Sequence, residues 1–275
     1  MQLNYDLLSQ YINQMKEHAR KKLSGVYSID RSDDELSTVM ASWIMYSMET
    51  EKLTAAKVIE LLKDDAKQRG SMVGTDIFFT SKSDSYQKED ELCKAGLDVI
   101  AKAWPDLTKL IQVIEPRIVK LRSDMEAIDG DYESSSGQTM FGHIYFTMNR
   151  TNPMGWAEIV AHEVGHHYLF AIFSAYHRSI NAPWKESFYS AIRKTNRPLI
   201  GVFHGVVAES FMIYLAYKVL CRPDLSSLHG EARELFQRQA DRFKVDFATV
   251  SQFGACKIEE TIDEITSSVA EIVNE

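Results

Sequence analysis

Residues 156–167, which read WAEIVAHEVGHH, decide the fold of this 275-residue chain. The stretch contains a His-Glu-x-x-His motif formed by His162, Glu163 and His166. Side chains four positions apart lie one above the other on a helix, so a helix here places His162 and His166 on one face. Two imidazoles in this arrangement can bind one metal ion. The stretch therefore predicts a metal-binding helix over about 154–175, with Glu163 beside the ion as the candidate catalytic residue.

A second helix is predicted over residues 198–220, and it is almost wholly apolar. An all-apolar helix is a core helix, so its polar residues need partners inside the protein. His204 and Glu209 are both candidates for a third metal ligand, and their five-residue spacing allows only one of them to reach the ion. Gly201 and Gly205 flank His204 and permit a close approach, which favours His204. Glu209 is then expected to accept a hydrogen bond from a metal-bound imidazole.

The remaining periodicities predict a mainly α protein with a small β-sheet, an α+β fold. Two β-branched, alternating stretches, 117–122 and 142–148, are expected to pair beside the metal-binding helix. We expect a helical N-terminal region over 1–85, a metal-binding catalytic core over 86–225 and C-terminal helices over 226–275, together forming one compact unit. Further helices are predicted over about 6–23, 32–48, 53–67, 88–103, 105–114, 230–247 and 258–272, with a short one ending at Arg193 and a connecting segment over 70–89.

Composition excludes several classes of protein. The net charge of -8 and the pI near 5.6 argue against nucleic-acid and anionic-membrane partners, both of which select clustered Lys and Arg. Three widely spaced cysteines, Cys93, Cys221 and Cys256, predict neither a disulfide framework nor a thiolate metal site. The N-terminus lacks a signal-peptide pattern, and no apolar run approaches the roughly 20 residues that span a bilayer. A cytoplasmic protein is the expectation.

Four segments together resemble a known enzyme family in both order and spacing. They are 141–146 (FGHIYF), 156–166, 183–184 (PW) and 197–205 (RPLIGVFHG). This middle part of the chain resembles the HExxH-type, iron- and α-ketoglutarate-dependent peptide β-hydroxylases of ribosomal-peptide (RiPP) biosynthesis. The resemblance does not extend to residues 1–85 or to the C-terminal helices.

The resemblance implies Fe(II) bound by His162, His166 and His204, with α-ketoglutarate and molecular oxygen as co-substrates. The implied activity is that of a dioxygenase, an oxidoreductase that hydroxylates a side-chain β-carbon of a precursor peptide. The far carboxylate of α-ketoglutarate needs a cation, and Arg197 is the prediction because it lies seven positions, two helical turns, before His204. Other candidates for contacts with α-ketoglutarate are Arg117, Arg122, Arg150, Tyr145 and Thr147.

Two other readings stay open at this point. In a zinc metallopeptidase of the HExxH type, His162 and His166 would bind zinc with either Glu209 or His204, and Glu163 would be the general base. In a hydroxylase no such base is required, so Glu163 would orient substrate or hydrogen-bond to a neighbour. In a binding protein the histidines would be structural.

Overall fold

The structure, a computed structural model, describes residues 77–79, 87–114, 117–123, 134–135, 143–147, 151–176 and 181–274. Its helices are α4 (Gln87–Ala103), α5 (Pro105–Ile114), α6 (Pro153–Tyr176), α7 (Leu199–Leu220), α8 (His229–Ser251) and α9 (Glu260–Ile272), with short 3-10 turns at Pro223–Leu228 and Ala255–Ile258. Its strands are β1 (Ile77–Phe79), β2 (Arg117–Ser123), β3 (Ser134–Ser135), β4 (His143–Thr147), β5 (Ser187–Ser190) and β6 (Thr195–Pro198). The predicted fold class, mainly α with a small sheet, is confirmed. The helices predicted before residue 70 lie outside the described residues.

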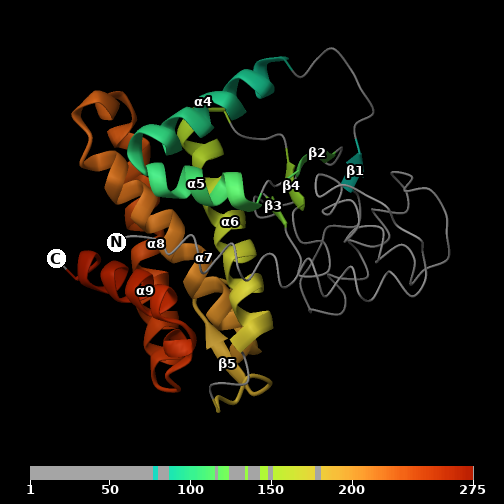
Figure 1. Cartoon of the computed structure of the whole chain (residues 1–275), viewed down its shortest axis with the longest axis vertical. Coiled ribbons are helices and arrows are strands. Elements are labelled where there is room, and N and C mark those ends of the chain that lie inside the picture. Colours follow the sequence, from blue (N-terminus) through green and yellow to red (C-terminus); the bar gives the residue numbers. More distant parts are fainter. Residues whose placement is uncertain are drawn as a thin grey trace.

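The sheet beside the helices has four strands in the order β1-β2-β4-β3. Strands β2 and β4 pair in parallel, and β1 and β3 are antiparallel to their neighbours. The two strands predicted from alternation, β2 and β4, are thus the central pair. Residues 77–79, expected within a connecting segment, form the edge strand β1 instead. In Figure 1 the sheet lies beside α5 and α6.

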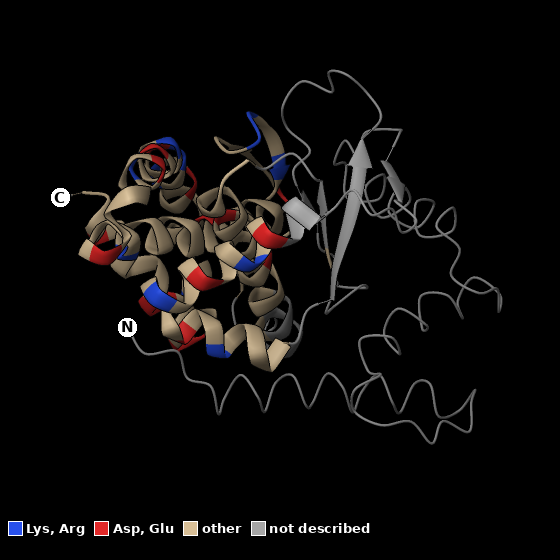
Figure 2. Ribbon diagram, turned by 90° about the horizontal axis from the view of Figure 1, so that it is seen from above, with Lys and Arg blue, Asp and Glu red and all other residues tan. Residues whose placement is uncertain are grey.

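Helix α7 is the centre of the helical part. It packs against α6 on one side, against α8 on another, and also against α9 and α4. Figure 1 shows these helices stacked around α7. Basic and acidic positions are interspersed along the described helices (Figure 2). Because fifteen of its residues are buried, including Glu209 and Ser210, α7 behaves as the core helix that its sequence predicted.

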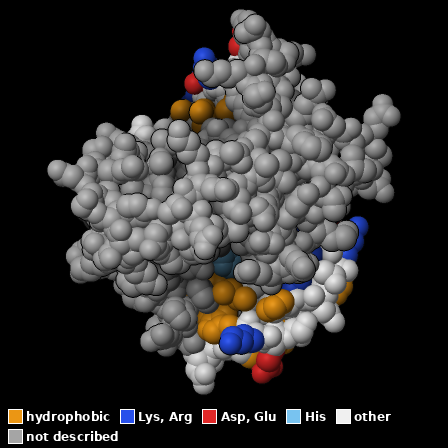
Figure 3. Space-filling view, turned by 90° about the vertical axis from the view of Figure 1, so that its right-hand side faces the viewer, with side chains coloured by type: hydrophobic (Ala, Val, Ile, Leu, Met, Phe, Trp, Pro, Cys, Tyr) orange, Lys and Arg blue, Asp and Glu red, His pale blue; other side chains and the backbone are white. Residues whose placement is uncertain are grey.

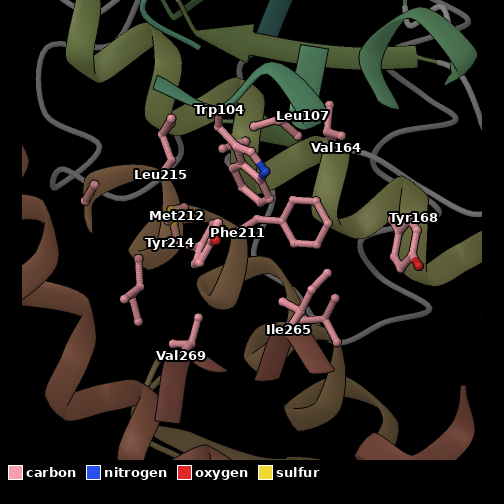
Figure 4. Packing of buried hydrophobic residues seen from close by; sticks show 14 of the residues in the cluster. Trp104, Leu107, Val164, Tyr168, Phe211, Met212, Tyr214, Leu215, Ile265 and Val269 are labelled. Carbon is pink, nitrogen blue, oxygen red and sulfur yellow. The ribbon is translucent and has the colours of Figure 1, made fainter. Parts of the chain in front are cut away.

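Aromatic side chains fill the core between α5, α6 and α7 (Figure 4). Trp104, just before α5, lies with its ring centroid 5.4 Å from that of Phe211 and 4.8 Å from that of Tyr214. Tyr168 of α6 approaches the other side of Phe211, at 5.8 Å. Tilted and edge-on contacts of this kind stabilise aromatic pairs beyond the area they bury. They fix α6 and α7 against each other next to the His-Glu-x-x-His motif.

One expectation about membranes needs correction. One helix among the described residues, α7, is long and apolar enough to cross a bilayer. The prediction that no apolar run approaches this length was therefore wrong. However, 78% of its most apolar window is buried inside the protein. Core helices of soluble proteins pass the same test of length and composition.

The segment between α6 and α7 also differs from the prediction. A short helix ending at Arg193 was expected, but the chain forms an antiparallel hairpin in which β5 and β6 pair from Ser187↔Pro198 to Ser190↔Thr195. The hairpin turn, residues 191–194, contains Lys194 with a φ of 53°. The backbone N–H groups of Leu199 and Ile200 donate to carbonyls in the segment that enters the hairpin, so this segment satisfies the first turn of α7.

Candidate metal centre

Helix α6 begins where its sequence provides a cap. The side chain of Asn152 accepts a hydrogen bond from Gly155 N at 2.8 Å, and Pro153 occupies the first helical position. A side-chain acceptor and a first-turn proline both stabilise a helix N-terminus. The helix then runs unbroken through the His-Glu-x-x-His motif, which fixes His162 and His166 one turn apart as predicted.

The Nε2 atoms of His162 and His166 lie 3.1 Å apart, and the ring planes are perpendicular with centroids 4.6 Å apart. Two nitrogens bound to one ion at about 2.1 Å, with an angle of 90–109° between them, are about 3.0–3.4 Å apart. The observed separation therefore fits two ligands of a single ion. The side chain of His162 is 24% exposed, so an ion could reach it.

Burial keeps this pair neutral. Desolvation, with a smaller effect from the positive charge of Arg193, lowers the pKa of His162 to about 3. Desolvation also lowers the pKa of His166 well below its usual range, assisted by the charges of neighbouring histidines and of Arg193. Metal binding requires the neutral imidazole with a free lone pair. The two rings are held in that protonation state.

The third imidazole, that of His204, comes from α7. Its ring centroid is 5.8 Å from that of His166, with 31° between the ring planes. For imidazoles bound to one ion at adjacent positions, ring centroids lie about 4.6–5.3 Å apart, so His204 is slightly too distant as placed. Accordingly, no group of three His, Cys, Asp or Glu side chains among the described residues is placed to hold an ion. The structure places the ring of His204 next to that of His166 but does not arrange the three predicted histidines around one shared centre within the described residues.

The close approach of α6 and α7 depends on Gly165. A Cβ atom at this position would lie 3.1 Å from the Cα of Ala208 and 3.1 Å from the ring of Phe211. Such contacts are tighter than side chains normally make, so a residue larger than glycine would push the helices apart. Because Gly165 directly precedes His166, this crossing point sets the distance between His166 and α7.

Glu163 lies beside the pair and is almost completely buried. Its side chain is 1% exposed, and Oε1 lies 4.0 Å from His162 Nε2. This position is near enough for Glu163 to contact a ligand bound next to His162. The structure therefore places Glu163 beside His162.

Glu209 lies elsewhere, on the face of α7 that also carries Gly205. Its carboxyl group is 1% exposed, and its Oε2 atom has no hydrogen-bond partner among the described residues. Burial raises the pKa of Glu209 well above its usual range, the negative charge of Asp246 adds to this effect, and Arg242 and Arg193 oppose it. Glu209 was predicted to accept a hydrogen bond from a metal-bound imidazole. The buried Nδ1 atom of His162 has no hydrogen-bond partner in the described part of the chain, so this bond is not formed with His162.

The two glycines that flank His204 are covered by side chains of the hairpin. A Cβ atom at Gly205 would lie 2.5 Å from Cδ1 of Ile192, and one at Gly201 would lie 3.4 Å from Nε of Arg197. The side chains that approach these two glycines closely are therefore Ile192 and Arg197 of the same chain. Arg197, the predicted α-ketoglutarate ligand, lies along the first turn of α7, and its charge acts on Asp246.

Sequence reasoning missed the contribution of Arg193. Its positive charge acts on the pKa values of His162, His166 and Glu209. The available signal was the β-propensity of Phe188, Tyr189 and Thr195, which favours a hairpin over the predicted short helix.

Figure 3 shows histidine atoms on one face of the molecule, next to hydrophobic side chains. Arg117, Arg122, Tyr145 and Thr147 lie in strands, and their side chains are outside the described part of the structure, as is the whole of Arg150.

Comparison with known proteins adds no relative. No protein-family profile matches the chain, and no curated protein matches it significantly.

Proposed function

We propose that this protein is an Fe(II)- and α-ketoglutarate-dependent dioxygenase that hydroxylates a side-chain β-carbon of a ribosomally made precursor peptide. The observation that supports this most is the position of His204, whose ring lies next to that of His166. Glu209 follows His204 by five positions on α7, well over one turn, so the two side chains leave the helix in different directions. A third neutral imidazole suits an iron centre that binds a dianionic co-substrate, since the ion keeps its full positive charge.

Each side chain then has a definite part in the site. His162, His166 and His204 hold the iron, which with α-ketoglutarate and oxygen supplies the oxidising step when bound. Gly165 keeps α6 close enough to α7 for the three rings to converge. Glu163, almost fully buried beside His162, orients the substrate or the ligand next to that ring. Helix α7 and the aromatic core exclude water from the inner side of the site.

The direct test is a spectroscopic titration. Under nitrogen, protein loaded with Fe(II) is expected to develop a weak visible charge-transfer band when α-ketoglutarate is added. Zinc-loaded protein, which has no such transition, serves as the control. No band from protein that demonstrably holds iron would overturn the proposal.

One observation favours the second candidate, a zinc metallopeptidase. Glu163 Oε1 lies 4.0 Å from His162 Nε2, as needed for a base acting on a water bound at that position. Peptide cleavage by zinc-loaded protein, without α-ketoglutarate and lost in Glu163→Gln, would establish the peptidase. For the hydroxylase, the expected product is a candidate precursor peptide that gains the mass of one oxygen atom.

A further inference from the structure

The β5–β6 hairpin is a two-stranded sheet whose hydrogen-bond register follows from one contact at its base. Leu199 N donates to Glu186 O at 2.9 Å, so these two residues form a hydrogen-bonded pair. Hydrogen-bonded and non-bonded pairs alternate along antiparallel strands, and three positions further along Tyr189↔Asn196 is therefore a non-bonded pair. The backbone groups of a non-bonded pair point away from the partner strand. Asn196 thus directs its N–H and its C=O outward from β6.

The two strands differ in what covers their outer edges. On β5, the N–H of Ala191 donates to the buried carboxylate of Asp246 on α8 at 2.7 Å, so α8 closes the end of this edge. On β6, Asn196 and Pro198 are exposed, and the Asn196 backbone makes no hydrogen bond within the part of the chain that the structure describes. The N–H and C=O of Asn196 and the C=O of Pro198 form what we call the β6 edge. Unpaired backbone groups of an edge strand can pair with another extended chain.

The hairpin and α6 are neighbours around the central helix α7. A Cβ atom at Gly205 of α7 would lie 2.5 Å from Cδ1 of Ile192 in the hairpin turn. A Cβ atom at Gly165 of α6 would lie 3.1 Å from the Cα of Ala208, also on α7. Residues three positions apart on a helix differ by only about 60° around its axis, so these two contacts fall on adjacent strips of α7. A chain bound along the hairpin therefore lies beside the helix that carries the His-Glu-x-x-His motif.

The hairpin is basic although the whole chain is acidic. Residues 185–198 contain four basic residues and one acidic residue, whereas the net charge of the chain is -8. Arg193 and Lys194, in the turn next to β6, are exposed, and neither makes an ion pair within the described residues. Pairing of two copies through β6 would bring these like charges together, which disfavours a second copy as the occupant. An acidic chain is the complementary partner.

We propose that the β6 edge binds an extended, acidic segment of a peptide as an added strand, with Arg193 and Lys194 beside its carboxylates. This inference rests on the proposed function, which makes a peptide the substrate, and it gives that peptide a docking place outside the metal centre. Main-chain hydrogen bonds supply affinity for an extended chain, and the cations of the turn select acidic side chains.

The test is a titration of the protein against a fluorescently labelled peptide of alternating Glu and Thr, followed by fluorescence anisotropy. Asn196→Pro removes the outward N–H without removing a hydrogen bond of the hairpin, and it is expected to weaken binding about 3- to 10-fold. Tyr189→Pro, which makes the same change at the paired position of β5, is the matched control and should bind like wild type. Asn196→Ala keeps the N–H and should also bind like wild type. Thermal unfolding of each variant checks that the fold is intact.

The same peptide methylated at its backbone nitrogens makes the test independent of any variant. It keeps its charge but cannot pair as a strand, so wild-type protein should bind it about 3- to 10-fold more weakly. Arg193→Glu tests the role of charge. This reversal is expected to weaken binding of the Glu-Thr peptide by a similar factor, and to strengthen binding of a matched peptide of alternating Lys and Thr.

Each part of the inference has its own contrary result. Equal binding of the methylated and unmethylated peptides would overturn strand addition, and equal losses in Asn196→Pro and Tyr189→Pro would overturn the choice of β6. No binding of the Glu-Thr peptide, or a dimer of the protein that Asn196→Pro abolishes, would overturn the acidic peptide as the occupant. The measurement uses neither iron nor α-ketoglutarate, so these results leave the proposed function standing. That function fails separately, if the iron-loaded protein shows no charge-transfer band with α-ketoglutarate.

Discussion

At the residue scale, burial shifts the pKa values of one group on α6 and one on α7. His162 is held neutral because desolvation lowers its pKa to about 3. Desolvation, with the negative charge of Asp246 adding to it, raises the pKa of Glu209 well above its usual range. In both cases burial disfavours the charged form. The neutral histidine is ready to bind a cation.

Glu209→Gln is expected to stabilise the protein at neutral pH. The folded state keeps the Glu209 proton at pH values where the unfolded chain has lost it, so wild-type stability falls as the pH rises above about 4.5. Glutamine has a similar shape and does not ionise, so the variant should be more stable by about 1–3 kcal/mol near pH 7 and gain nothing near pH 4. Denaturant unfolding across this range measures the difference.

The exposed residue Glu234, also on the helical part, provides the control for that experiment. Glu234→Gln should change the free energy of unfolding by no more than about 0.5 kcal/mol at any pH. Parallel stability curves for wild type and Glu209→Gln would contradict the raised pKa of Glu209.

Metal content should separate His204 from Glu209. We expect His204→Ala to lose iron and Glu209→Ala only to bind it more weakly, because only the ring of His204 lies next to His166. Mass-spectrometric metal analysis of both variants decides between them. His229→Ala, which removes an imidazole hydrogen-bonded to the carbonyl of Arg222, is the control. The opposite order would make Glu209 the ligand and favour the peptidase.

At the scale of elements, the site is a crossing of two helices, α6 and α7. Their spacing is set by Gly165, which lies against Ala208 and Phe211. The N-terminal end of α7 is fixed separately, by the hairpin and by α8. The imidazoles of α6 and the imidazole of α7 are therefore positioned by different contacts, and each set can be perturbed alone.

Gly165→Val is expected to destabilise the protein by about 1–3 kcal/mol, because the added methyl groups meet backbone and ring atoms. Moving α7 away should also weaken metal binding, which isothermal titration with Zn(II) measures. Gly230→Val is the matched substitution, since a Cβ atom there meets nothing within 4 Å. If Gly165→Val binds zinc as tightly as wild type, the helix spacing does not set the metal site.

Most helices could be predicted because their signals are local. The apolar periodicity of α4 and α5, Pro153 at the start of α6, and the apolar run of α7 all lie within the elements they define. The β5–β6 hairpin was mistaken for a short helix because its stability comes from contacts with another element. Ser190 and Ala191 bond to Asp246, more than fifty positions away, and no local pattern reveals such a partner.

The same distinction applies to the candidate site. His162 and His166 are four positions apart on one helix, and this spacing alone predicts that their side chains are neighbours. The approach of His204 depends on the packing of α6 against α7, which the flanking glycines suggested only indirectly. The electrostatic effect of Arg193 on the histidines depends on the hairpin turn that carries it, which the sequence indicated only through the β-propensity of the flanking residues.

At the scale of the whole molecule, the helices α4 to α7 and the C-terminal helices α8 and α9 share one hydrophobic core. Residues of α4 to α9 belong to a single buried cluster, including Leu107, Val164, Phe211, Phe243 and Val269. An ion that links α6 to α7 is therefore expected to stabilise all of these helices together.

Metal binding should raise the unfolding temperature in a single transition. A ligand present at 100 times its dissociation constant adds about 2.7 kcal/mol to the free energy of unfolding. Differential scanning calorimetry with Zn(II), and with a chelator as the reverse control, measures the shift, which should be absent in His204→Ala. A shift confined to one of two separate transitions would show that the helices do not unfold as a unit.

The three cysteines differ in their accessibility to thiol reagents. Cys93 and Cys256 are buried, and burial raises the pKa of Cys256 to about 12, whereas Cys221 is exposed at the end of α7. Thiol reagents should therefore modify Cys221 first in the folded protein. It follows His204 by seventeen positions along a continuous helix, so a spin label attached there would sit about 25 Å from the third imidazole. Magnetic-resonance methods can measure a distance of this size between a spin label and a paramagnetic ion.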